Sequence, residues 1–120
     1  VAGDIPGPLS ATTRSAVIIA GDLSAGSDGV FNAEETRIFG ETMAHEVGHY
    51  MGLYHPVETE WDHWDSLDDT DECTGQNRCI TAMSDHLMFP FPVCGFAACQ
   101  AQVVLTGDQM GVMQAYVGVD

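Results

Sequence analysis

The first element that the pattern of apolar and polar positions predicts is one short strand. The run SAVIIA, Ser15–Ala20, places three β-branched residues in succession and is bounded by Gly21. Such a run predicts a buried strand. The residues before it, Val1–Thr13, are rich in glycine and proline, and we expect them to be irregular. Small residues dominate Gly21–Gly29, which predicts a loop.

A helix is predicted next, because its first turn carries a capping signal. Asn32 is followed three positions later by Glu35, the pairing of a capping box. The helix runs to about Met51, and Gly52 is its natural stop. Apolar residues recur along it at four-residue spacing, and we expect this stripe to face the core. The stripe consists of Phe39, Met43, Val47 and Met51.

The rest of the chain predicts a long loop and then a second helix. Thr59–Thr81 is polar and acidic without apolar periodicity, which favours irregular structure. Thr106 and Gln109 form another capping box and open a helix that reaches about Val117. The predicted apolar face of this helix carries Met110, Met113, Tyr116 and Val117.

Length and charge narrow the classes of protein. A chain of 120 residues supports one domain with one core. It carries 18 acidic residues against 3 arginines and no lysine, so its formal net charge is −15. Nucleic acids and anionic membrane surfaces attract the opposite sign, and we therefore expect neither as a partner.

Four cysteines lie in the second half of the chain, at Cys73, Cys79, Cys94 and Cys99. An even number in a short acidic chain predicts two disulfides and an oxidising compartment. We therefore expect a secreted or extracellular protein, with the periplasm or a cell surface as alternatives. Four cysteines allow three pairings, and the spacing does not choose among them.

The segment AHEVGHYMGLYHP carries the clearest chemistry. His45 and His49 are four positions apart, so on a helix they lie one turn apart on the same face. Glu46 stands beside them, where a carboxylate reaches a metal-bound water. Catalytic zinc takes three protein ligands, and the turn at Gly52 would carry His55 back to supply the third. These positions fit the extended pattern H-E-x-x-H-x-x-G-x-x-H.

Three motifs together resemble a known clan of enzymes. They are HEVGHYMGLYHP, the acidic DSLDDTDEC and HLMFP, and the resemblance as a whole covers roughly Ser15–Val117. The chain resembles metzincin metallopeptidases, most closely the pappalysin-type group and its bacterial relatives. The resemblance implies an α+β fold with a small twisted sheet backed by the active-site helix. Residues 1–120 would form a single domain with two parts. Residues 1–55 would hold the remnant of the sheet and the active-site helix, and residues 56–120 a disulfide-bonded C-terminal part with a Met-turn and a C-terminal helix.

The Met-turn of this clan places a methionine beneath the metal ligands as an apolar floor. Met88 lies 33 residues after His55, in SDHLMFPFP, where Pro90 and Pro92 favour a tight turn. Met83 is the competing candidate. We favour Met88 because its apolar and proline neighbours suit a buried turn.

The resemblance implies a secreted zinc endopeptidase that cleaves protein or peptide substrates. His45, His49 and His55 would bind zinc, and Glu46 would be the general base that activates the zinc-bound water. A non-catalytic zinc-binding module and a fragment that acts in protein interaction are the alternatives. Clan domains are longer before the strand, so three alternatives stay open: a very reduced member, a fragment that lacks an N-terminal segment, or a fold that another chain completes.

Calcium is a second candidate ion, because eight acidic residues crowd Glu58–Glu72. Hard carboxylate ligands at this density suit Ca2+. A solvated acidic loop is the alternative explanation. The candidate calcium ligands are Asp65, Asp68, Asp69 and Asp71.

Overall fold

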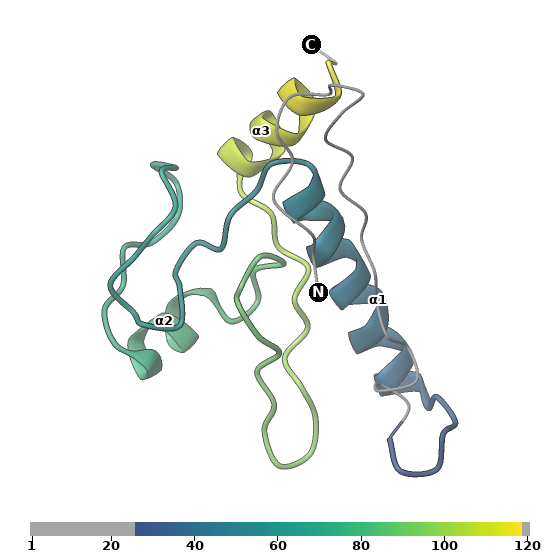
Figure 1. Cartoon of the computed structure of the whole chain (residues 1–120). Helices are drawn as coiled ribbons and strands as arrows, with labels where there is room; N and C mark the ends of the chain where they lie inside the picture. Colours follow the sequence, from purple (N-terminus) through teal and green to yellow (C-terminus); the bar gives the residue numbers. More distant parts are fainter. Residues whose placement is uncertain (1–25, 119–120) are drawn as a thin grey trace.

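The computed structural model describes residues 26–118 and contains three helices in this range (Figure 1). They are α1 (Ala33–Tyr50), α2 (Gln76–Met83) and α3 (Gly107–Val117), joined by long irregular segments. Only isolated β-bridges occur between the described segments. The predicted strand Ser15–Ala20 lies outside the described residues, so the α+β class stays a prediction. No helix within residues 26–118 combines the length and apolarity needed to cross a bilayer.

Helix α1 begins and ends where its capping signals predict. The Asn32 side chain accepts a hydrogen bond from the Glu35 backbone N–H, and the Glu35 carboxylate accepts one from the Asn32 N–H. The capping box thereby satisfies two of the backbone N–H groups that have no partner within the helix. At the other end Gly52 has φ of 94°, a conformation that glycine adopts without strain. The prediction of a helix from Asn32 to about Met51 is confirmed.

The face of α1 that packs inward differs from the predicted one. Met43 and Val47 are 47% and 43% exposed, so the expected burial of their stripe is wrong at these two positions. Gly48 is the buried residue of the helix instead. A Cβ atom added there would lie 2.5 Å from the Met88 sulfur and 3.5 Å from Leu53. The lack of a side chain at Gly48 therefore lets the C-terminal half of the chain approach the helix closely.

A small core lies under α2. Its buried members include a disulfide between Cys73 and Cys79, which pins the start of the helix, together with Met83 and Phe89. The prediction that Thr59–Thr81 forms a loop throughout is wrong at its end, because α2 begins at Gln76. Two buried residues one turn apart hold this eight-residue helix, too few for a periodic pattern to appear in the sequence.

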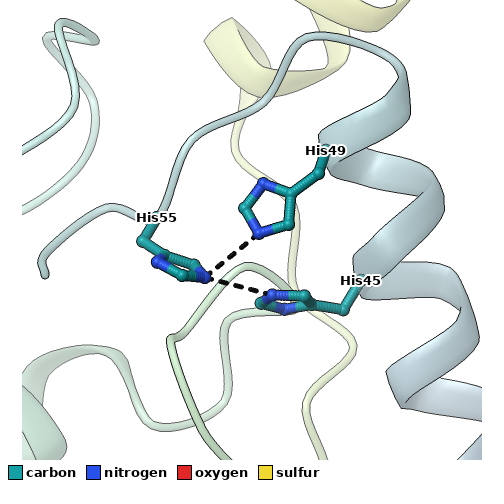
Figure 2. A group of neighbouring side chains, drawn as sticks. All are labelled: His45, His49 and His55. Atoms are coloured by element: carbon teal, nitrogen blue, oxygen red, sulfur yellow. Dashed lines mark hydrogen bonds between the residues drawn. The ribbon is translucent and has the colours of Figure 1, made fainter. Parts of the chain in front are cut away.

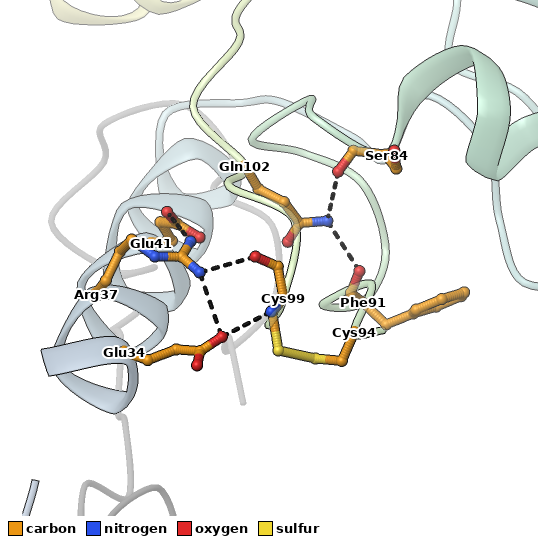
Figure 3. The surroundings of a disulfide bond; sticks show 8 residues. All are labelled: Glu34, Arg37, Glu41, Ser84, Phe91, Cys94, Cys99 and Gln102. Carbon is orange, nitrogen blue, oxygen red and sulfur yellow. Dashed lines mark hydrogen bonds and ion pairs between the residues drawn. A yellow bond between two sulfur atoms is a disulfide. The ribbon is translucent and has the colours of Figure 1, made fainter. Parts of the chain in front are cut away.

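A second disulfide closes a hairpin that leans against α1 (Figure 3). Cys94 and Cys99 are bonded and also form an antiparallel bridge. The Cys99 backbone is clamped to the helix, because its N–H donates to Glu34 at 2.6 Å and its carbonyl accepts from Arg37 at 2.9 Å. Arg37 also pairs with Glu41 at 2.7 Å. The structure thus resolves the pairing that the cysteine spacing left open.

Helix α3 is tied at its start to another segment of the chain. The predicted Thr106–Gln109 capping box is present, and Gln109 is fully buried. The Asp69 carboxylate accepts a hydrogen bond from the Asp108 N–H at 2.8 Å, which ties the acidic loop to the helix start. The predicted apolar face is only partly buried, since Met110 and Val117 are about half exposed.

Candidate metal centre

Three histidines converge at the inner face of α1 (Figure 2). His45 and His49 project from the helix, and His55 reaches them from the segment that follows. The His55 Nε2 atom lies 3.2 Å from the Nε2 of His45 and 3.1 Å from that of His49. All three ligand atoms lie within 4.8 Å of one another, the arrangement that can hold a metal ion.

The turn after α1 sets the position of His55. The Gly52 N–H donates to the His49 carbonyl, and the Leu53 N–H donates to the Gly48 carbonyl. These bonds satisfy the last carbonyls of the helix while the positive φ of Gly52 reverses the chain. Leu53 is then buried against the helix, which fixes the start of the segment that carries His55.

Each imidazole is oriented by a bond at its second nitrogen. The Nδ1 of His45 lies 2.7 Å from the Leu87 carbonyl, and the Nδ1 of His49 lies 2.7 Å from the Leu53 carbonyl. A carbonyl oxygen only accepts hydrogen bonds, so both Nδ1 atoms must carry the proton. The Nε2 atoms of the neutral rings are therefore lone-pair donors that face the centre of the cluster.

The spacing of these nitrogens fits a tetrahedral ion. Two unprotonated Nε2 atoms have no proton to share, so their close approach is unfavourable without a cation between them. Zinc bonded to nitrogen at about 2.0–2.1 Å in a tetrahedron separates its ligands by about 3.3–3.4 Å. The separations of 3.1 and 3.2 Å around His55 are close to this edge length. The donor set and its geometry therefore suit zinc.

Burial favours the neutral imidazole that a metal requires. The pKa of His45 is lowered from its ordinary value of 6.5, mainly because burial disfavours the charged ring. The Leu87 hydrogen bond opposes this change, while the neighbouring His49 and His55 add to it. A neutral His45 at neutral pH leaves its Nε2 lone pair free for an ion.

Glu46 lies beside the cluster with one oxygen that has no protein partner. Its Oε2 atom is buried and makes no hydrogen bond. Glu46 and His45 together line a hollow of about 90 Å³, whose opposite wall includes Phe89 and Phe91. A buried carboxylate oxygen without a partner needs a donor such as water or a ligand. This position suits a group that accepts a proton inside the cleft.

Met88 lies in the buried layer against α1, next to the helical turn that carries His49. It is fully buried, and its sulfur lies against Gly48, which is next to His49 on α1. The preceding carbonyl, that of Leu87, holds the ring of His45. Met83, the competing candidate for the Met-turn, lies in α2 and belongs to the separate core cluster. The local geometry thus favours Met88 as the apolar floor.

Sequence reasoning missed one residue of the site. The Glu58 carboxylate accepts a hydrogen bond from the Nδ1 of His55 at 3.0 Å. It therefore fixes the third imidazole as the two carbonyls fix the others. Its position three residues after His55 was the only available signal, and it lay within a run of eight acidic residues.

The proposed calcium ligands do not gather into a comparable group. Among residues 26–118, the three histidines are the only set of at least three such side chains close enough to share an ion. Asp65 accepts bonds from Thr70 and the Leu67 N–H, and burial raises its pKa above the ordinary 3.8. Asp69 is used at the start of α3, where the Asp108 N–H lowers its pKa.

The site is assembled from residues that are local in sequence and from one carbonyl that is not. The histidines, Glu46 and Glu58 lie within fourteen positions of one another, whereas Leu87 comes from the second half of the chain. Two disulfides accompany the site and are consistent with an extracellular location. Comparisons with protein-family models, curated proteins and solved structures find no match to this chain.

Proposed function

We propose that this protein is a secreted, zinc-dependent endopeptidase of the metzincin type. The observation that carries the proposal is the convergence of three Nε2 atoms whose partner nitrogens are all committed elsewhere. A buried carboxylate oxygen without a partner stands next to them on Glu46. A metal site that only stabilises a fold is usually closed by four protein ligands, whereas three ligands leave a position open.

His45, His49 and His55 would hold the ion through Nε2, each ring kept in place by its Nδ1 partner. An ion bound there supplies a Lewis acid, which makes water more acidic and a peptide carbonyl more electrophilic. The residues of the chain supply orientation and proton transfer.

Glu46 has the position required of the general base. Its unpartnered Oε2 accepts a proton from the attacking water as oxygen bonds to the peptide carbon. The carboxylic acid then returns that proton to the leaving nitrogen when the carbon–nitrogen bond breaks. Glu46 ends the cycle ionised, and one water has been divided between the two new termini.

The hollow beside Glu46 supports a polypeptide as the substrate. Its aromatic wall, Phe89 and Phe91, packs edge to face with ring centroids 5.2 Å apart. On the helix side the hollow is lined by Thr42 and His45. A hollow with one aromatic wall next to the reacting group suits one substrate side chain, which would orient the neighbouring peptide bond.

The deciding experiment measures proteolysis together with metal content. Zinc-loaded protein should hydrolyse a denatured protein such as casein, lose this activity with a chelator, and recover it with added zinc. Glu46→Gln should keep one bound zinc and lose at least about a hundredfold in kcat, the usual contribution of a general base. Glu60→Gln changes an exposed glutamate outside the cleft and serves as the control. Zinc binding without hydrolysis in the wild type would leave the non-catalytic module as the function.

A further inference from the structure

Two hollows lie in succession along one side of α1. The first contains Glu46 and His45, and the second lies between the start of the helix and the disulfide-closed hairpin. Ile38 lines both, so the two hollows adjoin at this residue. They extend from Asn32 to Glu46, about 20 Å at the rise of an α-helix. We call these two hollows together the α1 groove.

The wall opposite the helix is mainly apolar, with Gln102 as its polar exception. Phe89 and Phe91 form it beside Glu46, and the hairpin tip forms it at the far end. Phe96 at that tip is fully exposed. Its whole ring is therefore accessible to a partner, and an aromatic side chain that becomes buried on binding contributes a large apolar contact. The Cys94–Cys99 disulfide holds this side chain at the rim of the α1 groove.

The helix side of the α1 groove is acidic. Among the described residues that line the two hollows, four are glutamates and none is lysine or arginine. Arg37 pairs with two of these glutamates, Glu41 at 2.7 Å and Glu34 at 3.8 Å, and also bonds to the Cys99 carbonyl. The four carboxylates still outnumber this one guanidinium, so the helix side keeps a net negative charge. The negative groove belongs to a chain whose formal net charge is −15. Such a surface attracts a cationic partner and repels an anionic one.

We propose that the α1 groove holds an extended, cationic segment of the substrate polypeptide and anchors it on Phe96, away from the bond that is cut. The inference rests on the proposed function, because one of the two hollows that make up the groove contains Glu46. An extended segment rises about 3.3 Å per residue, so about six residues span the groove. Basic side chains face the glutamates of α1, and apolar ones face the hairpin.

Steady-state kinetics test the anchor at Phe96. One short peptide substrate is compared with two longer ones, extended by about six lysine- and leucine-rich residues on either side of the cut bond. Phe96→Ser should raise KM for one extended peptide about tenfold relative to the short peptide. Val103→Ser changes an exposed apolar residue outside the groove, and it should leave that ratio as in the wild type. Equal effects of Phe96→Ser on all three peptides would overturn the proposal.

A binding measurement separates this inference from the proposed function. Fluorescence anisotropy is recorded for the labelled basic peptides, and for copies with glutamate in place of lysine, on the Glu46→Gln protein. The protein should bind at least one basic peptide in preference to its acidic copy, and Phe96→Ser should weaken this binding about tenfold. This result would support the groove even if the wild type cleaved nothing. Equal affinity for basic and acidic peptides, or affinity independent of Phe96, would overturn it while leaving any measured proteolysis intact.

Discussion

The histidine cluster and the acidic loop are both rich in metal-binding side chains, yet only one of them converges. His45 and His49 stand on one rigid helix, and a fixed turn brings His55 to them. The acidic loop has more candidate ligands, but its carboxylates bond to their own surroundings, as Asp65 does with Thr70. The difference teaches that a metal site depends on how each ligand side chain is oriented by its other hydrogen bonds, more than on the number of candidate ligands nearby.

The two regions also differ in what their hydrogen bonds accomplish. In the cluster, each Nδ1 bond turns a lone pair toward the centre, so the bonds prepare a site. In the loop, Asp69 accepts from the N–H of Asp108 and satisfies the start of α3. The same kind of bond therefore preorganises one region for an ion and consumes the ligands of the other.

The largest expected effect is the loss of the ion itself. His49→Ala removes one of three ligands and leaves two, fewer than a zinc site in a protein normally has, so we expect zinc stoichiometry measured after dialysis to fall from one to near zero. His63→Ala is the matched control, because this histidine is exposed and lies outside the cluster. Retention of one tightly bound zinc by His49→Ala would mean that the ion sits elsewhere.

A smaller effect is expected from the carboxylate behind His55. Glu58→Ala removes the acceptor of the Nδ1 proton, and outer partners of metal-bound histidines typically contribute about 10–100-fold to metal affinity. Competition with a chromophoric chelator measures this change. Glu60→Ala, two residues along in the same acidic run, should leave the affinity within about twofold of the wild type. An equal loss in both variants would point to general charge rather than to orientation of His55.

Two ions can be compared directly in an unfolding experiment. Zinc at about 100 times its dissociation constant should raise the free energy of unfolding by about 2.7 kcal/mol, because it binds the folded chain. Calcium should raise it far less, since the four candidate aspartates do not gather among the described residues. Thermal unfolding of metal-free protein with each ion measures the difference. A calcium effect as large as that of zinc, abolished by Asp65→Asn, would restore the acidic loop as a site.

The smallest effect is expected at Asp69 and depends on pH. The Asp108 N–H lowers the pKa of Asp69 in the folded state below the ordinary 3.8. Its stabilising contribution is therefore present above pH 3.8 and is lost as the pH falls through the lowered folded value. In metal-free denaturant titrations, Asp69→Asn should flatten this acid-side decline relative to wild type and to Asp68→Asn. Identical pH profiles for all three proteins would exclude the role of Asp69.

The sequence predicts those features whose causes lie within about one helical turn. The capping residues Asn32 and Thr106 set the starts of α1 and α3, and the structure confirms both boxes. The histidine spacing needs only a helix and the stop at Gly52, both encoded locally, so the cluster could be anticipated. The metal's identity, the peptidase activity and the metzincin fold stay predictions, because no family or structural match tests them.

The features that could not be predicted depend on contacts far apart in sequence. The inward face of α1 is chosen by Met88 against Gly48, forty positions away, and this contact leaves Met43 outside. Hydrophobic periodicity alone favoured the opposite face. The disulfide between Cys73 and Cys79 spans only six positions, yet its pairing could not be read from the spacing because four cysteines allow three pairings.

The contact between Gly48 and Met88 has a consequence for how the chain acquires its metal during folding. Before residues 87 and 88 arrive, an early α1 already carries two of its ligands, but the ring of His45 lacks the carbonyl that orients it. A contact between residues forty positions apart carries a loop-closure cost that the local contacts of a helix do not, so it tends to form later in folding. Metal capture should therefore occur in two kinetic phases, a weak early encounter and a late tightening that reports the arrival of the C-terminal half.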